Sequence, residues 1–368
     1  MEEYLFSRLG ITQIPEKRNY WLVRTNGGQY FEDFYFDNYI GIEWDEIVSA
    51  DYSDIESLKL QVEEHYPKEI RSGYVASQID KFVREFTKGD IVIIPNKNSK
   101  IFAIGEIAED SIYIASEENK EGLLFEEDLE NQIQFLKKRR KVNWINCFHR
   151  HELDNRLQTF IYAHNTIVDL NNYALFIDRT LSDYYIKGKY AYFTFRVNKT
   201  SKIALDNMTD LMIFNRKLCQ FVNKYFPDDF HINSGEIISK IDVQSKGPVQ
   251  LSGPIKKILA IGFAATLVCG GTIKFNLTDG IEVSTGGIAE LITTFGDLYT
   301  KITDNTVNQN YRELQQDYQK LLEEYNSCKQ DLLLSTPEST QKNIRIEEQN
   351  TTDSDTQKKD RKSTRLNS

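Results

Sequence analysis

A group of aromatic and polar residues in the first fifty positions has the composition of a pocket for a nucleic-acid base. Every base has a π face and an exposed hydrogen-bonding edge, so a pocket that holds an unstacked base needs rings and polar groups. The candidates for the rings are Trp21, Tyr30 and Trp44, and those for the hydrogen bonds are Arg24, Asn26 and the main chain of Gly27 and Gly28. Large rings are usually buried, so the competing interpretation is that Trp21 and Trp44 belong to the core.

The strongest basic cluster lies at positions 137–141 and contains Lys138, Arg139 and Arg140. On an exposed strand such a cluster can hold a phosphate backbone. Basic side chains on an edge strand also prevent edge-to-edge aggregation, and this is the alternative without a ligand. We expect Lys138, Arg139 and Arg140 to contribute to nucleic-acid binding.

A short motif could support metal-dependent DNA cleavage instead. Asp242, Gln244 and Lys246 have the types and order needed to hold a divalent metal and a lysine beside a phosphate. Gly247 and Pro248 follow directly and should interrupt the strand that such a site requires. We therefore expect no catalytic residues, with these three as the alternative. We also expect no metal and no cofactor, because Cys147, His149 and His151 have no second cluster to complete a tetrahedral site.

The charge balance limits how the chain can bind nucleic acid. Its 368 residues carry 45 Lys and Arg against 55 Asp and Glu, a net charge of −10. This is the wrong sign for a protein that coats DNA without specificity, so binding must depend on a local patch. The four cysteines lie far apart without a C-x-x-C pair, which favours a reducing, cytoplasmic setting.

The elements that must position the candidate pocket follow one another closely. Apolar runs, period-two alternation and turn residues predict strands at 20–24, 40–44, 89–95, 100–106, 111–115 and 135–144. Helical segments are expected at 30–36, 72–86 and 153–165, and an acidic insertion at 117–131.

This order resembles the EVE-like module of the PUA superfamily, which stands at the N-terminus of Mrr-type restriction proteins. The resemblance rests on a strand ending in Arg24, the Gly27-Gly28 turn, the strand through Gly41 to Trp44, Gly89-Asp90-x-Val92-x-x-Pro95, and Arg140-x-Val142-x-Trp144. It implies a small β-barrel domain over 15–147 that reads nucleic acid, DNA rather than RNA, through a flipped and modified base. It also implies a prokaryotic restriction or phage-defence setting. An Mrr-like endonuclease and a non-catalytic, membrane-associated adaptor are the alternatives.

The remainder is expected to complete an α+β protein with a second, smaller α+β region at 148–250. Residues 258–273 are the only long uncharged apolar run, within a segment at 255–290 that ends in β-like alternation. As a helix the run would span about 24 Å, short of the roughly 30 Å hydrocarbon core. It is either a short membrane anchor, at the inner face of the membrane, or a buried helix or strand.

A heptad seam at 307–332, within an expected helix at 300–335, predicts either a coiled coil that forms a homo-oligomer or an amphipathic helix packed on the protein. Polar residues dominate at 336–368, where disorder is expected. The last nine residues resemble a translated sequencing adapter and are left out of the functional interpretation.

Overall fold

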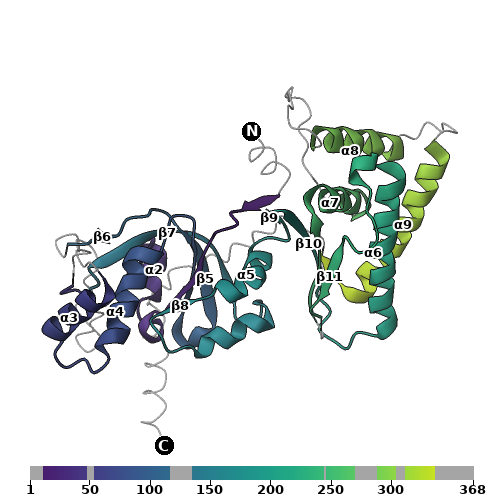
Figure 1. Ribbon diagram of the computed structural model, residues 1–368. Coiled ribbons are helices and arrows are strands. Elements are labelled where there is room, and N and C mark those ends of the chain that lie inside the picture. Colours follow the sequence, from purple (N-terminus) through teal and green to yellow (C-terminus); the bar gives the residue numbers. More distant parts are fainter. Residues whose placement is uncertain are drawn as a thin grey trace, which may run out of the picture.

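The computed structural model describes residues 11–47, 54–116, 135–243, 246–269, 288–303 and 311–335. These residues form two lobes, each built around its own β-sheet (Figure 1). The expected acidic insertion at 117–131 and the tail at 336–368 lie outside the described residues. The α+β class expected from the sequence is confirmed.

The first lobe contains a seven-stranded mixed sheet in the order β3-β7-β5-β4-β2-β8, with β6 beside β7. Its central strands β2 and β4 are parallel and are buried along their whole length. Burial on both faces explains their uninterrupted apolar sequences. The strands are β2 (Tyr20–Val23), β3 (Tyr39–Ile42), β4 (Ile91–Pro95), β5 (Ile101–Ile107), β6 (Tyr113–Ile114), β7 (Lys138–His149) and β8 (Ile167–Asp169).

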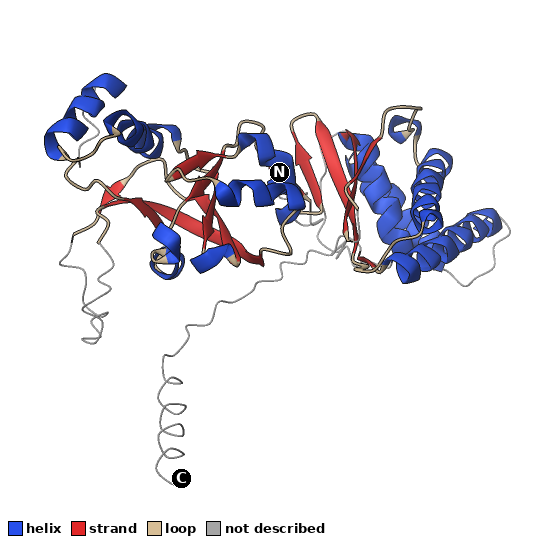
Figure 2. Cartoon of the chain, turned by 90° about the horizontal axis from the view of Figure 1, so that it is seen from below, coloured by secondary structure: helices blue, strands red, loops and turns tan. Residues whose placement is uncertain are grey.

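The sheet curls into a half-barrel because the long strand β7 pairs with two different strands along its length. Its first residues pair with β3 and its remaining residues pair with β5. The β5–β7 register shifts between Ile104 and Gly105, and such a bulge bends a strand. A side chain at Gly105 would come within 2.6 Å of Val142 and Trp144, so only glycine permits this close approach. Figure 2 shows the curled strands with helices around them.

The helices of this lobe cover the sheet and close its ends. The longest are α3 (Ile55–His65) and α4 (Ser72–Asp80), which continues into one π-helical stretch, η2 (Lys81–Glu85). The segment at 153–165, expected to be α-helical, instead contains the 3₁₀-helix η5 (Asn155–Tyr162). The others are η1 (Asn26–Gly28), α2 (Phe31–Phe36), η3 (Lys97–Ser99), η6 (Asn171–Tyr173) and α5 (Ala174–Leu181).

The second lobe is a six-stranded sheet with helices against it (Figure 1). Its order is β1-β9-β10-β12-β11, with β13 beside β10. The strands are β1 (Thr12–Ile14), β9 (Tyr184–Lys187), β10 (Tyr190–Val197), β11 (Ile238–Ile241), β12 (Gly247–Pro254) and β13 (Leu334–Ser335). The helices are α6 (Leu205–Tyr225), η7 (Asp228–Phe230), α7 (Ile255–Cys269), α8 (Ile288–Thr303) and α9 (Arg312–Leu332).

The chain passes between the lobes at different points from those expected. Strand β1 precedes the first lobe in sequence but pairs with β9 of the second. Strand β8 pairs with β2, so the first sheet continues beyond residue 147. Gly247 and Pro248, expected to interrupt a strand, are the first residues of β12.

The apolar run becomes α7, a helix in the core of the second lobe. Ten of its residues are buried, among them Leu259 and Phe263. Gly262 contacts the ring of Tyr184, whose hydroxyl donates to the Leu259 carbonyl at 3.1 Å. None of the helices in the described ranges is long and apolar enough to cross a membrane. The β-like run at 270–287 lies outside those ranges.

The heptad seam of helix α9 packs against other helices of the same chain. Leu314, Leu321, Tyr325, Cys328 and Leu332 are buried in the core that also contains α6 and α7. Lys224 of α6 bonds Glu313 and Asp317 at 2.6 Å each. The seam therefore packs as an amphipathic helix on the protein, the second of the two expectations.

Candidate functional site: a polar pocket between the two sides of the curled sheet

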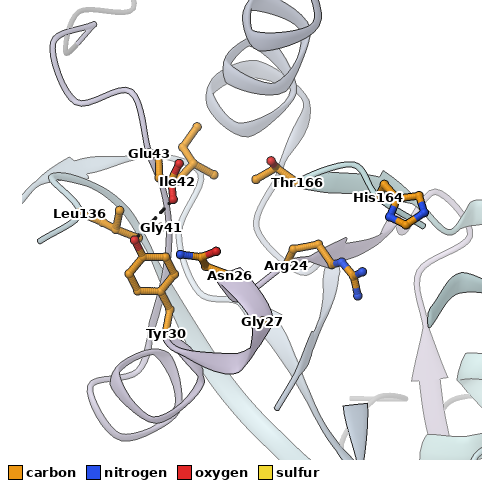
Figure 3. Close-up of a pocket in the computed structure, with 10 residues that line it drawn as sticks. All are labelled: Arg24, Asn26, Gly27, Tyr30, Gly41, Ile42, Glu43, Leu136, His164 and Thr166. Atoms are coloured by element: carbon orange, nitrogen blue, oxygen red, sulfur yellow. Dashed lines mark hydrogen bonds between the residues drawn. The ribbon is translucent and has the colours of Figure 1, made fainter. Parts of the chain in front are cut away.

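A cavity of about 270 Å³ lies between the two sides of the curled sheet, with the end of β2 and the start of β8 on one side and the end of β3 on the other. It is smaller than the roughly 300–1,000 Å³ of a pocket for a drug-sized ligand, so it suits a compact group. Figure 3 shows its lining residues: Arg24, Asn26, Gly27, Tyr30, Gly41, Ile42, Glu43, Leu136, His164 and Thr166. Four of them, Arg24, Asn26, Gly27 and Tyr30, were among the expected site residues.

The turn after β2 forms one wall because three successive residues adopt positive φ angles. Asn26, Gly27 and Gly28 have φ values of 48°, 67° and 100°. Asparagine and glycine tolerate this left-handed region best. Thr25 is buried and donates its hydroxyl to the Pro95 carbonyl at 2.5 Å, which fixes the turn against the end of β4.

Gly28 supports the turn and does not line the cavity. A Cβ at this position would lie 2.3 Å from the main-chain nitrogen of Lys97, so glycine is required for η1 to pack on η3. The expected role of Gly28 as a ligand-binding residue is corrected to a packing role.

Tyr30 and Glu43 form the polar centre of the pocket. The Tyr30 hydroxyl lies 3.5 Å from Oε1 of Glu43 (Figure 3). Burial, and then the nearby Glu43 carboxylate, raise the pKa of Tyr30 to about 12, so its hydroxyl stays protonated as a donor. Glu43 is half-buried and has no cationic partner among the described residues, which leaves it able to accept a hydrogen bond from a ligand. The sequence analysis did not identify Glu43 as a site residue, although it lies in the strand expected at 40–44, directly before Trp44.

The opposite side of the pocket carries Arg24, His164 and Thr166. The Arg24 side chain is half-exposed and makes no hydrogen bond or ion pair with the described part of the chain. Its main-chain nitrogen donates to the Thr166 carbonyl at 2.8 Å, which joins the end of β2 to the residue before β8. Tyr74 of α4 receives a hydrogen bond from the Thr166 nitrogen at 2.9 Å. His164 and Thr166 were missed because they are distant in sequence.

The two tryptophans do not line the cavity, so their expected roles as stacking faces are corrected. Trp21 is buried, stacks on Phe86 with ring centroids 4.6 Å apart, and donates its indole N–H to Asp90 at 3.0 Å. Trp44 is half-buried against the core and adopts a φ of 66°. Its carbonyl accepts a hydrogen bond from Lys138.

The basic cluster is split by the alternation of β7, and its expected phosphate contacts are corrected. Lys138 and Arg140 are fully buried. Lys138 lies 3.8 Å from the Asp45 carboxylate, and burial lowers its pKa to about 8 despite that carboxylate. Arg140 donates to the carbonyls of Phe82 and Val83 at 2.7 and 2.8 Å and so satisfies the π-helical stretch η2.

Arg139 faces the other way from its two neighbours but is also engaged. Its guanidinium lies 4.0 Å from the centre of the Tyr39 ring and 4.5 Å from that of Phe135. Its Nε donates to the Leu136 carbonyl at 2.7 Å. These contacts hold Arg139 flat on aromatic rings, away from the cavity lining.

Asp242 and Lys246 of the nuclease-like motif lie in different environments. Asp242 forms ion pairs with Arg156 at 2.7 Å and with the buried Arg179 at 2.8 Å, which connects the second lobe to the first. Lys246 is exposed, and Gln244 lies outside the described residues. Within the described ranges, no group of three or more His, Cys, Asp or Glu side chains is arranged to hold a metal ion.

Comparison with known proteins gives one match. A family model described as a domain of unknown function (DUF8426) matches residues 20–171. Searches of curated proteins and of solved structures found no match. The matched segment starts with β2 and ends just after β8, so it contains the whole curled sheet and every residue that lines the pocket.

Proposed function

We propose that this protein binds nucleic acid and holds one extruded base in the pocket between β2, β3 and β8. The observation that carries the proposal is the combination of a compact cavity, a Glu43 carboxylate without a cationic partner and an Arg24 guanidinium without an ion pair among the described residues. A cavity of about 270 Å³ suits a single ring system better than an extended ligand. Enzymes and readers that extrude a base bind it by its hydrogen-bonding edge in such a pocket.

The lining supplies groups for the edge of a base. A carboxylate accepts from the exocyclic amine of cytosine, and an asparagine amide can pair with adenine. Glu43 and Asn26 provide these two groups. On binding, the base would replace Gln29 Oε1, which accepts from Asn26 Nδ2 at 2.8 Å, and the long 3.5 Å bond from the protonated Tyr30 hydroxyl to Glu43. We therefore expect a base with an exocyclic amine, cytosine or adenine, to bind better than thymine. Arg24 is suited to the phosphate of the extruded nucleotide because its guanidinium has no protein partner among the described residues.

The resemblance to the EVE-like module of the PUA superfamily is the second support. The strands and turns that carry it all belong to the lobe of the curled sheet, and Arg24, Gly27 and Gly41 of these segments line the pocket. Under this proposal the first lobe is a PUA-like reader of DNA, with a modified base as its ligand. The protein would act in prokaryotic restriction or phage defence as a sensor and not as a nuclease.

Fluorescence anisotropy with labelled 12-nucleotide probes tests the proposal. The panel contains single strands and duplexes that carry one cytosine, methylated cytosine, adenine or thymine at a central position. We expect Glu43→Gln to lose about tenfold in affinity for the preferred base and little for thymine, since one base-edge contact contributes about 1–3 kcal/mol. Arg24→Ala should weaken binding to all bases.

Lys88→Gln is the matched control, because Lys88 is exposed just before β4 and does not line the pocket. The proposal fails if the parent protein binds no probe. It also fails if Glu43→Gln and Arg24→Ala both bind every probe as the parent does.

A further inference from the structure

The buried basic cluster on β7 leaves open how an acidic chain would hold a phosphate backbone, and the edge of the first sheet beside Arg24 and Gly27 offers an answer. Strands β2 and β4 are parallel, so their C-terminal ends lie at the same sheet edge. Strand β5 starts at that edge and β7 ends there, because both neighbouring pairs are antiparallel. Strand β8 also starts there, since Ile167 pairs with Val23.

This edge gathers three cations from two separate segments. Lys97 and Lys100 lie in the β4–β5 connection, and Arg150 follows β7. The Arg150 nitrogen donates to the Lys100 carbonyl at 2.8 Å, so these two residues are neighbours. Lys97 packs its main chain against Gly28, next to the pocket-lining Gly27. Lys97, Lys100 and Arg150 thus extend from the pocket along the edge.

The three side chains are available for a ligand. Lys97 and Lys100 are exposed and Arg150 is half-exposed. None of the three has a carboxylate within ion-pair distance in the described part of the chain. By contrast, the side chains of Lys138, Arg139 and Arg140 all donate hydrogen bonds to main-chain carbonyls of the protein.

Histidines add to the same edge. His149 and His151 stack with ring centroids 5.4 Å apart on either side of Arg150, and His164 lines the pocket. An exposed carboxylate, that of Glu152, also contacts this segment and accepts from the His149 main-chain nitrogen at 2.8 Å. The edge is therefore locally basic in a chain with a net charge of −10.

We propose that Lys97, Lys100 and Arg150 form the phosphate-binding track of the protein, along which a single nucleic-acid strand runs into the pocket. This inference rests on the proposed function and adds the path of the strand. Three separate cations along one edge suit successive phosphates of an extended strand, because each neutralised phosphate releases condensed counterions whatever the base.

The salt dependence of binding tests the track separately from the pocket. The variant Lys97→Gln/Lys100→Gln/Arg150→Gln should bind every single-stranded probe at least about tenfold more weakly at 0.1 M salt. Its slope of log affinity against log salt should be shallower by about 2, since each single-strand contact contributes about 0.7. The preference for one base over thymine should remain. Lys88→Gln/Lys141→Gln/Lys189→Gln removes the same charge from exposed positions elsewhere and should leave the slope unchanged.

The possible results of this experiment distinguish the phosphate-binding track from the pocket. An unchanged slope in the track variant, with base preference still lost in Glu43→Gln, overturns the track and keeps the pocket. An equal loss of slope in the control variant shows that net charge alone is responsible and also overturns the track. No binding by the parent protein overturns both proposals. Melting temperatures of both triple variants should match the parent, because all the substituted side chains reach solvent.

Discussion

Replacing Lys138 by methionine tests whether the strongest basic cluster of the sequence is a structural feature. Lys138 is fully buried beside Asp45, and its Nζ donates to the Trp44 carbonyl at 2.5 Å. Burial lowers its pKa from the ordinary value of 10.5 to about 8, so the folded chain holds this proton less tightly than the unfolded chain does.

The direction of the pH effect follows from this difference in proton binding. Between pH 8 and pH 10.5 the unfolded state keeps the Lys138 proton and the folded state has lost it, so stability rises with pH. The stabilisation that comes from this difference in the pKa of Lys138 is fully present above pH 10.5 and is lost as the pH falls through 8. Between pH 7 and pH 10 it amounts to about 2–3 kcal/mol. Lys138→Met removes this dependence, so the parent should gain that amount relative to the variant.

Urea unfolding of the parent and Lys138→Met at pH 7, 8, 9 and 10 measures the effect. Buried tyrosines also titrate at the alkaline end, but their contribution is common to both proteins and cancels in the difference. The control is Lys141→Met, an exposed lysine three positions along the same strand, where water already solvates the ammonium. If the free-energy difference between parent and Lys138→Met stays within about 0.5 kcal/mol across this range, Lys138 is not buried as described.

Four further substitutions test the packing of the two lobes. Gly28→Ala should destabilise the protein by about 2–4 kcal/mol, because its Cβ would meet the Lys97 main chain, whereas Gly27→Ala should cost only about 1 kcal/mol for its positive φ. Equal urea midpoints for the two variants would refute this. Gly262→Ala should destabilise the second lobe by about 1–3 kcal/mol, because the new Cβ would clash with the ring of Tyr184 from β9, and a raised melting temperature would contradict it. Asp242→Asn should cost about 2 kcal/mol by leaving a buried arginine with one carboxylate, and neither it nor the parent should cleave plasmid with Mg²⁺. Wild-type stability of Asp242→Asn, or Mg²⁺-dependent cleavage by the parent, would contradict this.

The order of the strands was predictable because it depends on local patterns. Uninterrupted apolar runs identify β2 and β4, and alternation identifies β5 and β7. The pocket turn was also predictable, since Asn26, Gly27 and Gly28 are residue types that tolerate a positive φ.

The burial of the basic cluster was present in the sequence but was overlooked. Alternation places Leu136, Lys138, Arg140 and Val142 on one face of β7, and two of these four are apolar. A charged residue between apolar ones on the same face of a strand indicates an inward position with a buried partner. Composition alone suggested an exposed patch, and the period of two gives the better prediction.

The other half of the pocket could not be predicted, because it depends on a pairing between distant segments. His164 and Thr166 reach the cavity through the β2–β8 pairing, which joins residues more than 140 positions apart. Nothing in the short segment before β8 identifies its partner strand. Likewise, the heptad seam of α9 fits either another chain or its own lobe, and only the position of α6 and α7 decides between them.

Photo-crosslinking tests the central claim, that the pocket holds an extruded base, most directly. A single strand with one photoreactive 5-iodocytosine, which keeps the exocyclic amine, is bound, irradiated and digested with trypsin, and mass spectrometry identifies the modified peptides. The two halves of the pocket fall in two tryptic peptides, residues 25–59 with Asn26, Tyr30 and Glu43, and residues 157–179 with His164 and Thr166. The account predicts crosslinks in one or both of these peptides, suppressed by excess unlabelled strand. Crosslinks confined to the second lobe, from residue 184 onward, would contradict it.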